Sequence, residues 1–294
     1  MSSEDLSLSP DFLRKLEFLR LATRKPLPGR SAALQRSSRL GRGMDFADHR
    51  AYSPGDDYSD IDWNLYGRLD RLMVRLAEEE RDLNLHVLVD CSRSMASGGK
   101  AEYVRQIVTA LAYITLARLD RIHVYPFAAT LGHPLSPSRS KAGALRVHRH
   151  LTTWPVDGET DLGAAARSFS EVARVRGVVL VLSDFLAPGG WQRGVQLLRH
   201  ARHEVALFQV TSPEEERVEA RGEVVLRDAE TGRQRRVRIT EAVARAYREA
   251  FVAHSEELQT FSRANRLTYI HASTGTPLED LILGSLRTER FLVG

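Results

Sequence analysis

The chain has 294 residues, of which 43% are hydrophobic and 27% are charged, a composition typical of a globular protein large enough to form its own core. Its single cysteine, Cys91, excludes an internal disulfide framework and is typical of a reducing compartment. The formal net charge of +4 comes from basic residues interspersed with acidic ones, which favours an ordinary solvated surface over a dedicated nucleic-acid-binding face.

The N-terminal segment has acidic residues early and lacks the apolar core of a signal peptide. No apolar run in the chain approaches the roughly 20 residues that a membrane-spanning helix requires. We therefore expect a soluble, cytoplasmic protein that does not bind to membranes.

The N-terminal part of the chain is expected to form a helix, an arm and a denser segment. The apolar stripe of residues 10–23 predicts a helix. Residues 25–43 are rich in Pro, Gly, Ser and Arg without periodicity, which indicates an extended loop or arm. In the denser segment 44–81, the sequence PGDD at 54–57 is a turn signal, and residues 72–76 predict a strand that leads into a charged hairpin.

From residue 83 the chain alternates between strand-like and helix-like patterns. Short aliphatic runs predict strands, and longer amphipathic runs between them predict helices. The predicted strands are 83–89, 121–127, 177–182, 204–210 and 267–271. The predicted helices are 99–119, 141–151, the later part of 158–174, 190–203, 241–265 and a short helix from Pro277. This alternation predicts an α/β fold with a doubly wound, mostly parallel sheet and helices on both faces.

One segment interrupts the alternation. Residues 222–228 and 233–239 flank a short turn and predict a β-hairpin, inserted at the sheet edge at about 218–239. Its second strand carries the basic sequence RQRRVR, which keeps a nucleic-acid contact open as an alternative, although it lacks the interleaved aromatic residues that single-strand binding favours. We expect two regions: residues 1–81 packed on the main domain, and the main α/β domain at 82–294.

Polar side chains gather where the predicted strands end. DCSRS at 90–94 follows strand 83–89, SD at 183–184 follows strand 177–182, and GETD at 158–161 precedes a helix. In a doubly wound sheet, ligands bind beyond the carboxyl ends of the strands. Carboxylate and hydroxyl oxygens are hard donors that suit Mg²⁺, Mn²⁺ or Ca²⁺. The pattern predicts a divalent-cation site that keeps open positions and attracts an external carboxylate.

A simpler interpretation stays open from the residues alone. Ser, Thr and Asp are favoured helix N-caps, worth about 1 kcal/mol each, so each of the three loops is also suited to capping the helix after it. Capping accounts well for any single loop. Three loops at consistent strand ends favour a shared cation.

Two catalytic motifs are excluded by their missing residues. Gly99 and Lys100 resemble the end of a phosphate-binding loop, but Ser94 and Ala101 stand where that motif requires Gly and Ser or Thr. A nucleophilic serine needs a histidine base, and none of the ten histidines lies in the three polar loops. We therefore expect neither an ATP site nor a serine nucleophile.

The three loops resemble a known metal site. DCSRSM after a strand, GETDL further along and VLSDF after the next buried strand resemble, in this order, the metal-ion-dependent adhesion site of the von Willebrand factor type A domain. The resemblance covers the α/β region. It implies that Ser92, Ser94 and Thr160 supply hydroxyl ligands. It also implies that Asp90 and Asp184 bind the ion directly or through water.

Three neighbouring side chains are expected around the ion or in contact with a partner: Glu159, Asp161 and Arg93. A glycine often stands in that family where this chain has Glu159. The additional carboxylate implies tighter ion binding or partial occupation of the site by the chain's own acid.

A second resemblance covers roughly residues 41–287. YSPGDDYSDIDW at 52–63 and VRLAEEER at 74–81, followed by the strand that ends in Asp90, resemble the bacterial family called domain of unknown function 58. Proteins of that family are encoded beside AAA-type ATPases of the MoxR class. The resemblance therefore implies a MoxR-type ATPase partner and a role in maturing or remodelling other proteins. Many members carry membrane helices ahead of this region, so the chain resembles a short soluble member.

These observations predict a protein–protein interaction module that binds an acidic residue of a partner through Mg²⁺, or through Mn²⁺ or Ca²⁺. The sequence shows no catalytic constellation, so we do not expect an enzyme. Two alternatives remain: a metal-dependent hydrolase with Glu159 or Asp161 as general base, and a basic nucleic-acid-binding protein.

Overall fold

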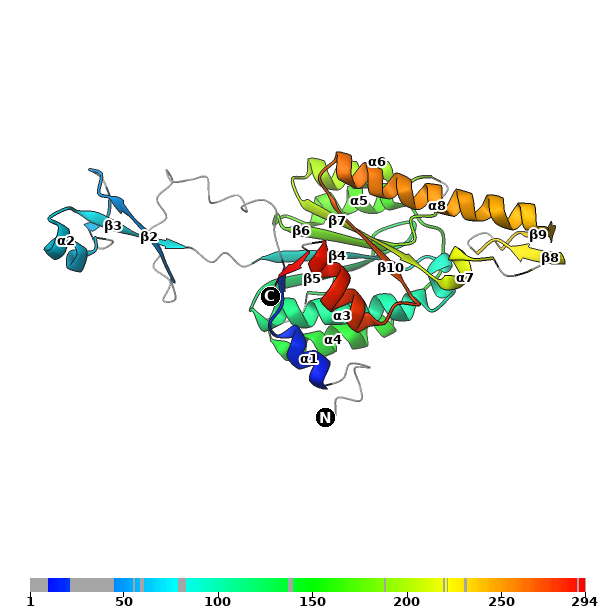
Figure 1. Cartoon of the computed structure of the whole chain (residues 1–294), viewed down its shortest axis with the longest axis horizontal. Helices are drawn as coiled ribbons and strands as arrows, with labels where there is room; N and C mark the ends of the chain where they lie inside the picture. Colours follow the sequence, from blue (N-terminus) through cyan, green and yellow to red (C-terminus); the bar gives the residue numbers. More distant parts are fainter. Residues whose placement is uncertain are drawn as a thin grey trace. The chain divides into compact units, whose positions relative to one another are not determined.

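The computed structural model describes residues 10–21, 45–54, 56–58, 61–78, 83–136, 140–187, 189–218, 220, 222–229, 232–289 and 291–293. The chain separates into two compact units (Figure 1). One comprises Met1–Pro28 and Leu83–Gly294, and the other comprises Gly29–Asp82. The expected region 1–81 is thus divided, because its N-terminal helix belongs to the α/β unit. The predicted arm lies outside the described residues.

A five-stranded sheet with the strand order β10-β7-β6-β4-β5 forms the centre of the α/β unit. Every neighbouring pair in it is parallel. The strands are β4 (Asn84–Asp90), β5 (Arg121–Phe127), β6 (Val178–Ser183), β7 (Glu204–Thr211) and β10 (Thr268–Ser273). All five were predicted to within two residues. The aliphatic run of β6 follows from its position, since β4 and β6 are both buried along their whole length.

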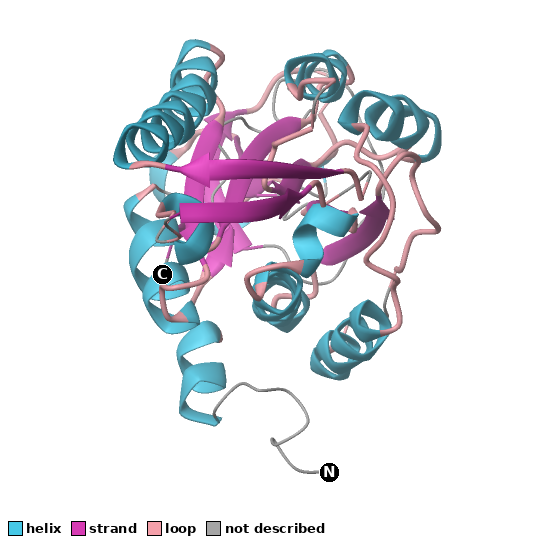
Figure 2. Cartoon of the chain, turned by 90° about the vertical axis from the view of Figure 1, so that its right-hand side faces the viewer, coloured by secondary structure: helices cyan, strands magenta, loops and turns pink. Residues whose placement is uncertain are grey.

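Helices cover both faces of this sheet (Figures 1 and 2). The long helices are α3 (Lys100–Ala117), α4 (Lys141–Thr152), α5 (Leu162–Val172), α6 (Gln192–His200) and α8 (Glu241–Ala264). One apolar core contains the buried faces of α3 and α4, and a second contains those of α5 and α6 together with Leu258 of α8. The predicted doubly wound α/β architecture is confirmed. None of the described helices combines the length and apolar character needed to cross a membrane.

The strand order places a switch point at the centre of the sheet. β4 lies between β5 and β6, so the chain leaves β4 toward one edge and leaves β6 toward the other. The helices that follow these two strands therefore cover opposite faces, and the loops at the two carboxyl ends diverge. A ligand site is expected in the crevice between them.

The two ends of the chain meet in a small antiparallel pair, β1 (Arg20–Leu21) with β11 (Leu292–Val293). Helix α1 spans Pro10–Leu16, which is shorter than the predicted 10–23, because the chain leaves the helix to form this pair. Phe12, Leu16 and Leu19 bury their side chains in the core beside α3. The C-terminal segment is helical, as predicted, and contains α9 (Leu278–Asp280), η4 (Leu281–Ser285) and α10 (Leu286–Thr288).

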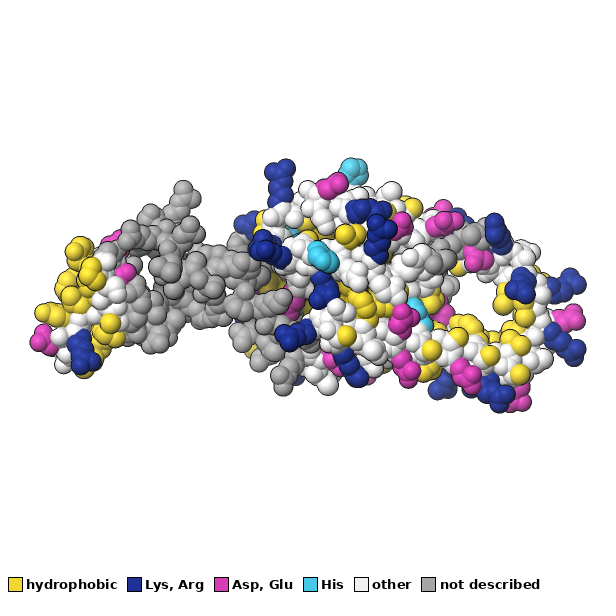
Figure 3. Space-filling model, turned by 90° about the horizontal axis from the view of Figure 1, so that it is seen from above, with side chains coloured by type: hydrophobic (Ala, Val, Ile, Leu, Met, Phe, Trp, Pro, Cys, Tyr) yellow, Lys and Arg dark blue, Asp and Glu magenta, His cyan; other side chains and the backbone are white. Residues whose placement is uncertain are grey.

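The inserted hairpin follows a short helix, α7 (Pro213–Glu216). It consists of β8 (Gly222–Arg227) and β9 (Gln234–Ile239), as predicted. Within the described residues these strands pair only with each other, so the hairpin forms a separate small sheet and does not extend an edge of the central sheet. It lies beside the first half of α8, and its basic side chains are exposed (Figures 1 and 3).

The second unit contains an antiparallel pair, β2 (Asp45–Ala51) with β3 (Met73–Glu78), and the helix α2 (Trp63–Leu69). Asp62 caps α2, because its carboxylate accepts hydrogen bonds from the backbone N–H groups of Asn64 and Leu65. At least one residue of the acidic run at 56–62, Asp62, therefore has a structural function.

Three histidines form a cluster near the amino end of the sheet: His86 of β4, His123 of β5, and His203. His86 stacks on His123 of the neighbouring strand at 5.2 Å between ring centroids and meets the ring of Phe169 edge-on at 5.4 Å. Its Nε2 donates to the carbonyl of Val175 at 3.0 Å. Burial, aided by His123 and His203, lowers the pKa of His86 to about 4. The imidazole therefore stays neutral in the folded protein at neutral pH.

We expect His86 to make the protein acid-sensitive. In the unfolded chain His86 takes up a proton near its ordinary pKa, whereas in the folded chain it does so only near 4. Its stabilising contribution is therefore complete above pH 6.5 and is lost as the pH falls toward 4. Between pH 8 and pH 5, urea unfolding should show that the wild type loses about 2 kcal/mol more than His86→Gln, whose side chain stays neutral. An equal loss in both proteins would contradict this.

Candidate metal centre

The carboxyl ends of β4 and β6 meet at the switch point. Asp90 is the last residue of β4 and Ser183 the last residue of β6, and the two strands are paired in parallel. The Ser183 hydroxyl donates to Asp90 Oδ2 at 2.5 Å and accepts from the backbone N–H of Phe185 at 3.0 Å. Asp90 is only 3% exposed. The two central strands thus hold a buried carboxylate between their ends.

Backbone hydrogen bonds join the loop after β4 to the loop before α5. The N–H of Arg93 donates to the carbonyl of Gly158 at 3.0 Å, and the N–H of Asp157 donates to the carbonyl of Cys91 at 2.8 Å. These two bonds bring the GETD segment alongside the DCSRS segment, although about 70 residues separate them in the chain. The third loop of the predicted site is therefore held in place by main-chain contacts.

Asp90 and three other predicted ligand residues come together at the end of β4. The N–H of Ser92 donates to Asp90 Oδ1 at 2.9 Å. The Thr160 hydroxyl lies 3.3 Å from Asp90 Oδ1 and 3.5 Å from Oδ2. The hydroxyl oxygens of Ser92 and Ser94 are 3.2 Å apart. One carboxylate and three hydroxyl groups therefore share a small volume at the end of β4.

Helix capping accounts for only one residue of these loops. Asp161 caps α5, because its carboxylate accepts from the N–H of Ala164 at 2.8 Å. Ser92 precedes the short helix η3 (Arg93–Ala96) but makes no side-chain cap bond, and the Thr160 hydroxyl is directed to Asp90. The hydroxyl groups needed for a cation are thus not used as caps.

Asp184 has a different partner from the one expected. Its Oδ2 accepts from Lys100 Nζ at 2.9 Å, and its Oδ1 accepts from the N–H of Leu186 at 3.1 Å. Lys100 is the first residue of α3, has a completely buried side chain, and also donates to Glu215 of α7 at 2.5 Å. The charge of Asp184 acts on Asp90, so the two carboxylates are close. Asp184 nevertheless forms an ion pair within the chain.

The electrostatics at Asp90 favour a cation. Burial, reinforced by the charge of Asp184, raises the pKa of Asp90 to about 6, although hydrogen bonds from Ser183 and Ser92 oppose the shift. Within the part of the chain that the structure describes, Asp90 forms no ion pair with a lysine, arginine or histidine. A buried carboxylate that only neutral donors contact is destabilising when ionised. A bound cation would relieve this destabilisation.

The donor set suits a hard cation. In the described ranges no group of three or more His, Cys, Asp or Glu side chains is placed to bind a metal, so an ion at Asp90 depends on hydroxyl oxygens. Cys91 lies between the donors in sequence, but its side chain is packed in the core, and burial raises the pKa of its thiol to about 12. The thiol packs among apolar side chains, with its Sγ near the carbonyl of Val89, and is not among the oxygen donors at Asp90.

The remaining predicted residues lie at the outer surface of the loops. Arg93 is exposed, and its Nε donates to Asp157 at 2.6 Å. This hydrogen bond holds the pKa of Asp157 below its usual value. Glu159 is exposed. Arg93 thus joins the first and second loops at the surface, in addition to its backbone bond.

Sequence reasoning placed Ser183 at the end of its strand without giving it a role, and it missed two residues of this centre, Lys100 and Glu215. A signal existed for Lys100, because the chain has only four lysines among its 42 basic residues. A cation in the first turn of a helix is disfavoured by the helix dipole, which marks Lys100 as a residue that requires a negative partner. No local signal identified Glu215, because α7 contacts Lys100 only in the folded chain.

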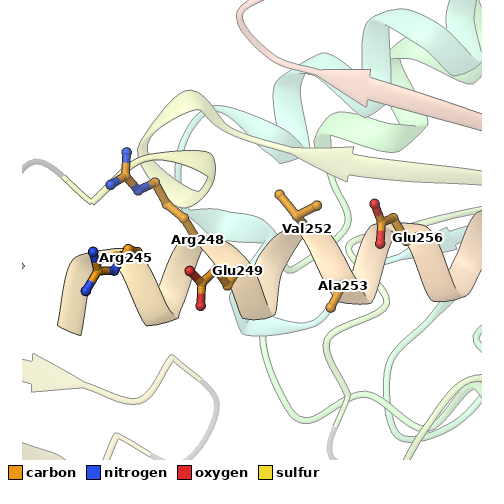
Figure 4. Close-up of a pocket in the computed structure, with 6 residues that line it drawn as sticks. All are labelled: Arg245, Arg248, Glu249, Val252, Ala253 and Glu256. Atoms are coloured by element: carbon orange, nitrogen blue, oxygen red, sulfur yellow. The ribbon is translucent and has the colours of Figure 1, made fainter. Parts of the chain in front are cut away.

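A separate hollow lies on the surface of α8 (Figure 4). Its lining comes entirely from that helix: Arg245, Arg248, Glu249, Val252, Ala253 and Glu256. It contains none of the predicted site residues and is not part of the centre at Asp90.

Comparison with known proteins gives relatives in mycobacteria. A profile of the family described as "Protein of unknown function DUF58" matches residues 48–257. An uncharacterized protein of Mycobacterium tuberculosis is 30% identical over 259 residues, which cover 85% of this chain and 76% of that protein. An uncharacterized protein of Mycobacterium avium is 36% identical over 104 residues, which cover 35% of this chain and 61% of that protein.

Similar solved structures include BatB from Bacteroides thetaiotaomicron, with a TM-score of 0.42 and 13% identity over 70% of this chain and 98% of BatB. They also include a von Willebrand factor type A structure from Catenulispora acidiphila, with a TM-score of 0.33 and 14% identity over 47% of this chain and 34% of that chain. The assignment to a family depends on the profile match, which covers more than half of the chain. By this criterion, the chain belongs to the DUF58 family.

Proposed function

We propose that the carboxyl ends of β4 and β6 bind a divalent cation through which the protein holds an acidic residue of a partner. The observation that carries this proposal is Asp90, a buried carboxylate that neutral donors contact and that three hydroxyl groups surround. Hard oxygen donors without sulfur or imidazole favour Mg²⁺, with Mn²⁺ or Ca²⁺ as substitutes. The protein is then a metal-dependent protein–protein interaction module.

In this proposal Ser92, Ser94 and Thr160 supply hydroxyl oxygens. Asp90 supplies a charged oxygen, directly or through water. Because Lys100 already contacts Asp184, we expect Asp184 to act through water. Such a ligand set leaves part of the ion's charge uncompensated, and the ion therefore attracts an external carboxylate.

The resemblance of the segments at 52–63 and 74–81 to the DUF58 family suggests the partner. We propose that the chain acts with a MoxR-type AAA ATPase in the maturation or remodelling of other proteins. The family assignment and the α/β fold support this proposal, because both agree with the family that the sequence resembles.

Binding is better supported than hydrolysis. A hydrolase would need Glu159 or Asp161 as general base. The carboxylate of Asp161 is used to cap α5, and Glu159 is exposed, whereas a general base works best in a site that excludes water. The donor set around Asp90 therefore fits an ion that holds a ligand.

Calorimetric titration of the purified chain with Mn²⁺ tests the proposal. We expect one ion per chain, and we expect Thr160→Val to weaken its binding about tenfold, because this change removes one hydroxyl ligand and keeps the branched shape of the side chain. Thr153→Val is a matched control, since the exposed Thr153 hydroxyl donates to the carbonyl of His150 and is not part of the three loops. Absence of binding in every variant that keeps Asp90 and the three hydroxyl groups would reject the site, and unchanged binding in Thr160→Val would remove Thr160 from it.

A further inference from the structure

A buried ammonium group stands beside the proposed metal centre. Lys100 is 0% exposed, and its Nζ lies 2.9 Å from Asp184 Oδ2 and 2.5 Å from Glu215 Oε1. It connects the start of α3, the end of β6 and α7. Lysine is among the residues least often buried completely, and it is then paired, as here. Its position requires a reason beyond packing.

Glu215 is itself fixed in place by α7. Its Oε2 accepts from the N–H of Ser212 at 3.0 Å, and its own N–H donates to the Ser212 hydroxyl, which completes a capping box. Gly98, with φ of +60°, packs so closely that a Cβ there would lie 2.3 Å from Ser212 Cβ. The loop before α3 and the start of α7 are therefore in direct contact, and Glu215 cannot move away from Lys100 without disturbing both.

Lys100, Asp184 and Glu215 together determine the net charge beside the proposed cation site. Lys100 Nζ lies between Asp184 Oδ2 and Glu215 Oε1, and a lysine held by two carboxylates is a cation. Lys100 neutralises Asp184, one of the two carboxylates expected to bind the metal, and occupies one of that carboxylate's oxygens.

We propose that Lys100 sets the metal affinity of the centre, because its ammonium group neutralises Asp184 and repels an incoming cation. The ion is then held weakly until the carboxylate of a partner completes its coordination. Glu215 has the opposite effect, since it offsets part of the lysine charge. This inference rests on the proposed function and names the residue that regulates the same site.

The test measures Mn²⁺ affinity by electron paramagnetic resonance of the free ion, with the full chain. Lys100→Met keeps an unbranched side chain that is one atom shorter and removes its charge, and we expect binding to tighten at least about tenfold. Glu215→Gln leaves the lysine charge less compensated, and we expect binding to weaken about threefold or more. The two changes thus have opposite signs, which general loosening of the structure would not produce.

A double-mutant cycle tests whether the effect acts through Asp184. In the wild type, Asp184→Asn should weaken Mn²⁺ binding at least as much as Glu215→Gln, because it too leaves the Lys100 charge less compensated. In the Lys100→Met background the same change should remove most of the gain in affinity. Lys15→Met is the matched control, and it should leave affinity unchanged. It removes an exposed lysine of α1 that pairs with Glu279 of α9 at 2.8 Å.

The outcomes separate this inference from the proposed function. If neither the wild type nor Lys100→Met binds Mn²⁺, both proposals are wrong. If the wild type binds and Lys100→Met binds equally or more weakly, only the role of Lys100 is wrong. Binding by Lys100→Met alone would support that role. If Lys100→Met fails to fold with or without Mn²⁺, Glu215→Gln decides: weaker binding supports the proposal, and unchanged or tighter binding overturns it.

Discussion

Replacing Asp90 by asparagine should abolish cation binding and at the same time stabilise the metal-free protein. Asparagine keeps an oxygen that can accept from Ser92 and Thr160, and the Ser183 hydroxyl can reorient to accept from its amide. The negative charge, which supplies most of the attraction for the ion, is lost. We expect the dissociation constant for Mn²⁺ to rise more than about 100-fold.

The stabilisation follows from the environment of Asp90. Its pKa in the folded chain, about 6, exceeds the ordinary carboxyl value, so the ionised form destabilises the fold at pH 7.5. This penalty disappears as the pH falls through 6 toward the ordinary value, and Asp90→Asn removes it at every pH. In EDTA at pH 7.5 the variant should be more stable to urea by on the order of 2 kcal/mol.

Asp11→Asn is the control for this pair of effects. Asp11 is an exposed residue of α1 and is not part of the three loops, so its replacement should leave the metal affinity unchanged. An Asp90→Asn protein that is less stable than the wild type in EDTA would show that the carboxylate is not a destabilising charge. Retention of Mn²⁺ by that variant would show that the ion, if bound, has other ligands.

Removal of the ion should abolish capture of the partner. We expect the tagged chain to retain a MoxR-type ATPase from its own cells in Mg²⁺ and to lose at least about 90% of it in EDTA, because the partner's carboxylate then has no metal to bind. Asp90→Asn should lose the partner equally in Mg²⁺. The measurement is quantitative mass spectrometry of the captured proteins, with Asp11→Asn as control.

The opposite result is equally specific. If the same proteins are captured in the same amounts in Mg²⁺, in EDTA and by Asp90→Asn, the interaction does not depend on the metal centre. Capture that depends on Mg²⁺ but does not include a MoxR-type ATPase would keep the metal-dependent module and reject the partner.

The sequence predicted the parts of the fold that local patterns determine. Strands such as Val178–Ser183 are short aliphatic runs, and their periodicity and length suffice to place them. The rule that parallel strand ends share an edge accounts for Asp90 and Ser183 lying near one another. Thr160 lies between α4 and α5, and the main-chain bond from Arg93 to Gly158 brings its loop to Asp90. The short α1 was not predicted, because it ends where a strand pair with the distant C-terminus begins.

The ion pairs of the centre were beyond sequence reasoning. Asp184 and Lys100 are 84 residues apart, and Glu215 lies on a four-residue helix that has no periodic pattern. Which carboxylate a buried lysine contacts depends on how α3 and α7 pack at the end of the sheet. Residue type and spacing predicted the oxygen donors around Asp90, but they did not predict that the ammonium group of Lys100 lies beside Asp184.

The central claim is that the oxygens of Ser92, Ser94, Thr160 and Asp90 can surround one hard cation. Anomalous diffraction at the manganese edge, from crystals grown with MnCl₂, tests it most directly. The account predicts one strong peak within about 2.3 Å of the Ser92 and Ser94 hydroxyl oxygens and no comparable peak elsewhere on the chain. A fully ordered site without a peak, or a peak at other residues, would contradict it.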